Sequence, residues 1–241
     1  DGYTCAIRES GQAVCWGRND GGQLGEGTRV QTWLPVDVKG LADAKAITAG
    51  SSQTCAVRKF GQALCWGEND RGQLGDGGTE PSLEPVEVIG LADAISISVG
   101  SGFSCAIRVS GVSLCWGANT NGQLGSGDIG TDSSSPKEVN GMDEARSISA
   151  GGGHACGERK NGDLYCWGVN WEGQLGDGTE PVRSSQVEVS GPDGTATISA
   201  GTCGTCSTGP TGQALCWGIN AQGQLGDGTL LDRSIPTAVL G

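Results

Sequence analysis

Short stretches in which apolar and polar residues alternate recur along the chain at a nearly constant interval. Within residues 41–90 they fall at 45–50, 54–58, 62–66 and 84–89. Alternation with a period of two, rich in β-branched residues and bounded by turn-forming residues, predicts β-strands. No stretch shows the periodicity of an amphipathic helix. The pattern therefore predicts an all-β fold.

A repeated motif sets the interval between these stretches. "CWGRNDGGQLGEG" at 15–27 returns in closely similar form at 65–77, 115–127, 166–178 and 216–228. A period of about 40–50 residues with many turn signals predicts the blades of a β-propeller. We therefore expect a single β-propeller domain, 1–241, built of four-stranded repeats with these boundaries: 1–40, 41–90, 91–140, 141–190 and 191–241.

One repeat is expected to lack a strand. The stretch of the type "LADAKAITAG" occurs four times (41–50, 91–100, 141–151, 190–201), whereas the other three stretches occur five times. The missing strand would precede Asp1 or follow Gly241. Five repeats lie within the range of about four to eight blades that propellers use, so we expect a closed five-bladed ring, which would be a monomer.

The hairpin between the second and third stretches carries a specific turn. Its loops read "ESG", "KFG", "VSG", "KNG" and "PTG", which suits a type I turn followed by a left-handed glycine, with Pro210 at the first position. If Arg8 and Gln12 close the loop, Cys5 faces Cys15 with Cα atoms about 4.5 Å apart, within disulfide reach. The same spacing pairs Cys55–Cys65, Cys105–Cys115, Cys156–Cys166 and Cys206–Cys216.

The cysteines also indicate the compartment. Five disulfides would place the chain in an oxidising environment; the alternative is ten buried free thiols, and the nine-residue gaps without His partners do not resemble a structural zinc site. Cys203 is the eleventh cysteine. It forms a C-x-x-C with Cys206, but the βαβ context of a redox site is absent. We expect a free thiol or an alternative partner for Cys206.

The repeated motif itself is best explained as architecture. We expect its Trp residues to pack between neighbouring repeats, its Leu residues to be buried, and its Asn and Gln amides to satisfy loop backbone groups. A phosphate cradle would need a Lys and a following helix. A calcium site is also disfavoured, because "GDGT" supplies one carboxylate per repeat and Ser126 replaces the Asp in the third.

Charge and chemistry narrow the function further. The chain carries 15 Lys and Arg against 27 Asp and Glu, a net charge of −12, which disfavours nucleic acid and anionic membranes as partners. No apolar run approaches the roughly 18–20 residues of a membrane span. With a single histidine, neither a Ser-His-Asp triad nor a histidine metal site is available in its usual form. We expect no enzyme, no metal and no cofactor.

The repeats resemble those of the regulator of chromosome condensation superfamily. The resemblance rests on the "WG-N--GQLG-G" core, on the following "PVDV" and "PVEV" strands, and on "ISAGGGHAC" (148–156). It spans essentially the whole chain. The cysteine-paired form "TCA-R--G-A-CWG" is similar to a secreted or surface-exposed bacterial branch. That superfamily typically has seven blades, so an arc of a seven-bladed propeller is the alternative to a closed ring.

The resemblance and the residues together predict a binding module. We expect a secreted or surface-exposed, non-catalytic scaffold that binds a protein or glycan through loops that differ between repeats. An enzyme-inhibitor role like that of the superfamily's β-lactamase inhibitor is the first alternative, and guanine nucleotide exchange on a small GTPase is the second. The candidate binding residues are Trp33, Asp70, Arg71, Phe103, His154, Trp171 and Glu172. For His154 the favoured interpretation is a packing position, because its column reads Tyr3, Gln53, Phe103, His154, Gly204. For Trp33 and Trp171 the alternative to binding is that each fills a local gap.

Overall fold

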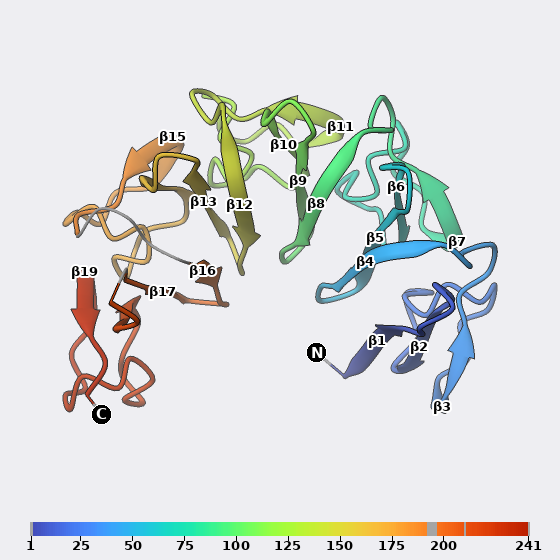
Figure 1. Cartoon of the computed structure of the whole chain (residues 1–241), viewed down its shortest axis with the longest axis horizontal. Coiled ribbons are helices and arrows are strands. Elements are labelled where there is room, and N and C mark those ends of the chain that lie inside the picture. Colours follow the sequence, from blue (N-terminus) through green and yellow to red (C-terminus); the bar gives the residue numbers. More distant parts are fainter. Residues whose placement is uncertain (1, 192–196, 210, 241) are drawn as a thin grey trace. The chain divides into compact units, whose positions relative to one another are not determined.

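The computed structural model describes residues 2–191, 197–209 and 211–240, and these form an all-β structure. Nineteen strands are present in the described residues, arranged in five antiparallel sheets, which confirms the predicted fold class. Within that part of the chain no helix is long and apolar enough to cross a membrane. Each sheet corresponds to one repeat (Figure 1).

The strands follow one another along the chain within each sheet. The first sheet holds β1 (Tyr3–Ile7), β2 (Ala13–Gly17) and β3 (Thr32–Asp37). The second holds β4 (Ala44–Ala49), β5 (Gln53–Arg58), β6 (Ala63–Gly67) and β7 (Ser82–Glu87). The third holds β8 (Ala94–Val99), β9 (Phe103–Arg108), β10 (Ser113–Gly117) and β11 (Ser133–Glu138).

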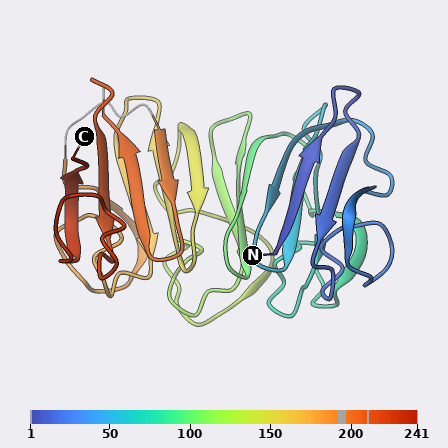
Figure 2. The ribbon, with the colours of Figure 1, turned by 90° about the horizontal axis from the view of Figure 1, so that it is seen from below.

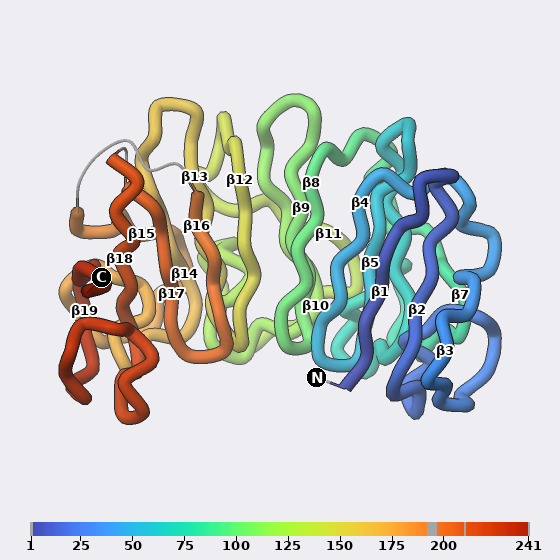
Figure 3. Tube along the Cα trace, turned by 60° about the horizontal axis from the view of Figure 1, so that its bottom comes forward, coloured from blue at the N-terminus to red at the C-terminus, as the bar shows by residue number. Residues whose placement is uncertain are grey.

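The last two sheets repeat this arrangement. The fourth holds β12 (Ala145–Ala150), β13 (His154–Arg159), β14 (Leu164–Gly168) and β15 (Arg183–Glu188). The fifth holds β16 (Thr197–Ala200), β17 (Gly204–Thr208), β18 (Ala214–Gly218) and β19 (Arg233–Ala238). The up-and-down path of the chain within a sheet can be followed in Figure 3. Among the described residues the first sheet has three strands and the others four, which confirms that one repeat lacks a strand.

The predicted hairpin turn is present. Arg8 N donates to the Gln12 carbonyl at 2.9 Å, and Gly11 N donates to the Arg8 carbonyl at 2.8 Å. Gly11 has a φ of 90°, and the four equivalent glycines have φ between 83° and 96°. A left-handed backbone at this position is strained for any residue with a Cβ, which explains why each loop ends in glycine. Pro210, expected at the first loop position of the last hairpin, lies outside the described residues.

The five disulfides form as predicted. Register places Cys5 opposite Cys15, and all five bonded pairs have Cα atoms 4.0–4.1 Å apart. Cys203 is the free cysteine. Because each bond joins two strands of one hairpin, the disulfides fasten each sheet to itself and not to its neighbours.

The residues group into two compact units. The first comprises Asp1–Val109, Leu114–Ala118 and Asp132–Lys137, and the second comprises Ser110–Ser113, Asn119–Thr131 and Glu138–Gly241. In the first unit, Leu24, Leu41 and Trp66 are buried in one apolar cluster. In the second, Leu175 and Trp217 are buried in another. Strands of adjacent sheets inside a unit stand side by side (Figure 2), so a repeat buries its apolar face against the next repeat of its unit.

Candidate functional site

The amide side chains of the repeated motif hold its own loop. The Asn69 Oδ1 accepts a hydrogen bond from Leu74 N at 3.0 Å, and its Nδ2 donates to Asp76 Oδ1 and to the Glu80 carbonyl. The Gln73 Oε1 accepts from Arg71 N at 2.8 Å. Equivalent bonds to the Asn and Gln side chains recur in the other repeats. The anchoring Leu residues are 0–3% exposed, as predicted: Leu24, Leu74, Leu124, Leu175 and Leu225.

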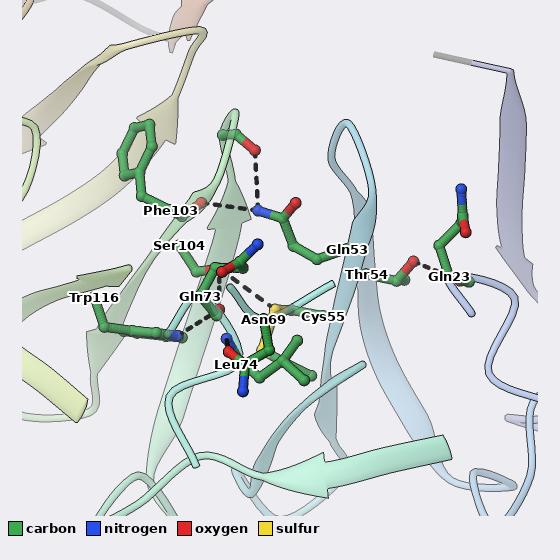
Figure 4. Close-up of a disulfide and its surroundings, with 12 residues drawn as sticks. Gln23, Gln53, Thr54, Cys55, Asn69, Gln73, Leu74, Phe103, Ser104 and Trp116 are labelled. Carbon is green, nitrogen blue, oxygen red and sulfur yellow. Dashed lines mark hydrogen bonds between the residues drawn. A yellow bond between two sulfur atoms is a disulfide. The ribbon is translucent and has the colours of Figure 1, made fainter. Parts of the chain in front are cut away.

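The backbone of the same loop binds the next repeat, at a contact that we call the junction. The Gln73 carbonyl accepts from Trp116 Nε1 at 2.9 Å and from Ser104 Oγ at 3.1 Å (Figure 4). The Gln23 and Gln174 carbonyls likewise each accept from a Trp and a Thr of the following repeat. The Gln123 carbonyl accepts from Trp167, and Ala155 stands where the other repeats have the hydroxyl that would donate a second bond. The packing role predicted for this Trp column is confirmed, and the hydrogen bond is an addition that the sequence did not reveal.

The carboxylates of the "GDG" segment are also used internally. Asp227, 2% exposed, accepts from Thr229 N at 2.9 Å and forms an ion pair with Arg233. Burial of the Asp227 carboxylate opposes ionisation, but the hydrogen bonds from Thr229, Arg233 and Asn220 outweigh it and hold the pKa below its usual range. The same opposition of burial and hydrogen bonds lowers the pKa of Asp177. Among the described residues, no group of three or more His, Cys, Asp or Glu could hold a metal.

Two of the candidate binding residues are buried. Phe103 and His154 are both 0% exposed, a position that a ligand at the surface does not reach. His154 Nε2 lies 2.8 Å from Thr205 Oγ1, which donates its own proton to the Gln174 carbonyl, so Nε2 carries the imidazole proton. Burial lowers the pKa of His154 to about 4. These two side chains therefore belong to the packing between repeats, as the alternative interpretation of their column proposed.

The other candidates are at the surface. Trp33 is 78% exposed and lies in strand β3 instead of the expected loop, and Trp171 is 60% exposed. Arg71 Nη1 lies 3.1 Å from Asp132 Oδ2. Glu172 accepts from Gln174 Nε2 at 2.9 Å, so its carboxylate is already engaged in its own loop.

One open pocket includes the candidate residue Asp70 in its lining. It measures about 300 Å³ and is lined by Arg29, Glu68, Asn69, Asp70 and Pro81 of the first unit. A guanidinium and two carboxylates therefore line the same pocket, so it can bind a negatively charged group through Arg29 and a positively charged group through Glu68 or Asp70. Asp70 is a predicted binding residue, whereas Arg29, Glu68 and Pro81 are not, because the sequence does not show which residues of two repeats meet at one pocket.

Comparison with known proteins follows the same repeats. One family model, described as "Regulator of chromosome condensation (RCC1) repeat", matches residues 10–57, 61–107, 110–157 and 161–208. A second model of the same description matches residues 44–73, 94–123 and 145–174. No curated protein sequence matches the chain significantly.

Solved structures show the same fold. Human WBSCR16 is 19% identical, with a TM-score of 0.89 over 100% of this chain and 65% of that one. Prp20p of Saccharomyces cerevisiae, described with its binding to Gsp1p and histones, is 21% identical, with a TM-score of 0.88 over 100% and 62%. The ectodomain of the Physcomitrella patens receptor kinase CR4 is 28% identical, with a TM-score of 0.59 over 91% and 50%. The chain thus spans less than two thirds of each relative. Since the repeat models cover most of its length, the chain belongs to the regulator of chromosome condensation (RCC1) repeat family.

Proposed function

We propose that the protein is an extracellular, non-catalytic binding module whose partner is another protein, held by residues that differ between repeats. The observation that carries this proposal is that the recurring residues of each repeat are used for folding, whereas exposed residues vary between repeats. The recurring Asn, Gln and Leu side chains and four of the five recurring Trp side chains are engaged inside the fold. Asp70, Arg71 and Trp171 are exposed, and Arg71 and Trp171 differ from the residues at the same positions of the other repeats. Recognition is left to these variable residues.

Two observations support the extracellular compartment. Five disulfides are stable in an oxidising environment and rare in a reducing one. The receptor-kinase ectodomain that the chain resembles is itself an extracellular segment by its description. A count of free thiols in the native protein tests this part: one alkylatable cysteine supports it, and eleven would contradict it.

A protein partner is favoured over other classes. The structurally similar Prp20p is described as binding Gsp1p and histones, which are proteins. The net charge of −12 favours a partner with a basic surface and opposes phosphate-rich ones. The one histidine does not support a catalytic role, because the His154 side chain is buried and neutral near pH 7. Enzyme inhibition and nucleotide exchange would be particular forms of the same protein binding.

The experiment uses affinity capture from the extracellular fraction of the native source, followed by titration of the captured protein. Asp70→Ala with Arg71→Ala tests the surface beside the pocket, and Trp171→Ala tests the second unit separately. We expect at least one of these variants to weaken binding about tenfold or more, as an interface anchor does. Phe60→Ala, on an exposed hairpin tip at 86% exposure, is the matched control. Equal affinity for all four proteins would contradict the proposed surface.

A further inference from the structure

The outer edge of the fourth sheet differs from the outer edges of the other four sheets. Strand β15 is the last strand of its sheet, so one side of it pairs with no strand of that sheet (Figure 1). The fourth residue of β15 is Gln186. The fourth residue of each other outer strand is a proline: Pro35, Pro85, Pro136 and Pro236. Proline in an edge strand removes a backbone donor and so opposes pairing with a further strand.

The backbone of Gln186 points to this open side. Val187 pairs with Cys166, and Val189 N donates to the Leu164 carbonyl at 2.9 Å, so the N–H and carbonyl groups of Val187 and Val189 face β14. Because these groups alternate in direction along an antiparallel strand, those of Gln186 and Glu188 face away from the sheet. Among the described residues no hydrogen bond uses them. The prolines at the equivalent position show that the other sheets form without this N–H.

Loops of the chain bracket the free part of the edge at both ends. The Ser184 carbonyl accepts from Gly127 N at 2.8 Å, and Ser190 N donates to the Gly176 carbonyl at 2.8 Å. Between them, residues 185–189 span roughly 16 Å at the rise per residue of a β-strand. A single extended peptide fits beside this short stretch. The same strand of a second copy is disfavoured, because it would bring its own two bracketing loops against those of the first.

The charge beside the free backbone groups defines the occupant further. Glu188 is exposed, and its carboxylate has no ion pair among the described residues. The cation of the same strand is engaged elsewhere, because Arg183 pairs with Asp177 at 3.3 Å and donates to Thr179 Oγ1 at 3.1 Å. An unpaired carboxylate on an edge strand favours Lys or Arg at the facing position of an added strand. The net charge of −12 favours a basic ligand in the same way.

We propose that β15 is a docking site for an extended, basic peptide segment of another protein, which adds to the fourth sheet as a further strand. The N–H and carbonyl groups of Gln186 and Glu188 exchange hydrogen bonds with the peptide backbone, as in β-strand addition. A Lys or Arg side chain of the peptide faces Glu188. The site belongs to the second unit, whereas Asp70 and Arg71 belong to the first, and it needs neither of them.

Two variants at one position separate backbone recognition from side-chain recognition. Gln186→Pro removes the outward N–H and reproduces the residue of the other four repeats, so we expect it to fold. Gln186→Ala is the matched control, because it keeps the N–H and shortens the same side chain. The probe is a synthetic peptide with blocked ends and the sequence Thr-Lys-Val-Lys-Val-Lys-Thr. Because the probe is synthetic, the result does not depend on the capture of a native partner.

The readout is nuclear magnetic resonance of the isotope-labelled whole chain as the peptide is added. In the unaltered protein and in Gln186→Ala we expect the Glu188 amide to shift and to exchange its hydrogen more slowly. In Gln186→Pro this response should be lost. A peptide with Glu in place of each Lys should bind about fivefold more weakly or worse, because it places like charges opposite each other. A peptide whose backbone is N-methylated on the residues facing β15 should not bind, and this arm leaves the protein unaltered.

Three results would overturn the proposal. One is a response of the unaltered protein confined to the amides of another strand, and a second is equal binding of the peptide by Gln186→Pro. The third is a change at the Glu188 amide that follows protein concentration without peptide, because a second copy would then occupy the edge.

Discussion

Replacing His154 should remove a pH-dependent loss of stability. The imidazole is 0% exposed, and its Nδ1 has no hydrogen-bond partner in the part of the chain that the structure describes. Burial lowers its pKa from 6.5 to about 4 in the folded chain, while the unfolded chain retains the higher value. At pH values between these two pKa values, His154 binds a proton in the unfolded state but not in the folded state. The free energy of unfolding therefore decreases as the pH falls. The stabilisation is complete above pH 6.5 and lost on acidification toward the folded pKa.

The magnitude follows from the two pKa values. An interval from 6.5 to about 4 corresponds to a loss of about 3 kcal/mol in the free energy of unfolding. His154→Phe copies the third repeat, where Phe103 occupies the same position at 0% exposure. This variant has no titrating ring, so its free energy of unfolding should change far less over the same range. His154→Gln, after Gln53 of the second repeat, provides a polar alternative.

The assay is urea unfolding followed by tryptophan fluorescence at intervals from pH 7.5 to pH 4.5, with disulfides intact. The quantity compared is the change with pH, because packing differences between variants shift all points equally. Asp177 and Asp227 have pKa values below the usual carboxylate range in the folded chain. The stability that they contribute is therefore lost only at pH values below those of this assay. If the parent and both variants lose the same free energy between pH 6.5 and pH 4.5, the assignment of a buried neutral His154 is refuted.

The remaining predictions concern the core, the junction and the disulfides. Leu74→Ala should cost about 2–5 kcal/mol in unfolding free energy, whereas Arg71→Ala should stay within about 0.5 kcal/mol; similar denaturation midpoints would contradict the buried anchor. Trp116→Phe removes a donor to the Gln73 carbonyl and should cost about 1 kcal/mol in unfolding free energy. Trp16→Phe should cost clearly less, because Trp16 Nε1 has no hydrogen-bond partner among the described residues. Equal losses would show that the junction hydrogen bond contributes nothing. Mass spectrometry of the unreduced protein should find five links within hairpins and an alkylatable Cys203; any link between repeats would exclude the pairing.

Local chemistry made much of this structure predictable. The loop glycines specify the hairpin turn, and the turn fixes which residues face each other, so the pairing of Cys5 with Cys15 followed by counting. The strands expected at 45–50, 54–58, 62–66 and 84–89 occur at Ala44–Ala49, Gln53–Arg58, Ala63–Gly67 and Ser82–Glu87. Each of these features depends on residues close together in the sequence.

Contacts between repeats were harder to predict. Variation between repeats predicts Phe103 and His154 as binding residues, yet both side chains are buried, and His154 contacts Thr205 of the next repeat. The segment "TRVQTWL" shares little with its counterparts, so the sequence predicts a loop at Trp33, although Trp33 lies in strand β3. Counting back from Pro35 and Pro85 would have aligned it with Leu83. The hydrogen bond from Trp116 to a backbone carbonyl has no sequence signal, since any residue supplies a carbonyl.

The short span of the disulfides has a consequence for how the protein matures. Ten cysteines could in principle pair in on the order of hundreds of ways, but each native pair is separated by only 10 positions. A hairpin forms within about 1–10 μs, long before a thiol is oxidised. Synthesis at about 5–20 residues per second delivers successive hairpins several seconds apart. Each disulfide can therefore form before the cysteines of later repeats have been synthesised, so few incorrect disulfides need to be rearranged. The exception is the last pair, because Cys203 is synthesised just before Cys206 and could compete with it.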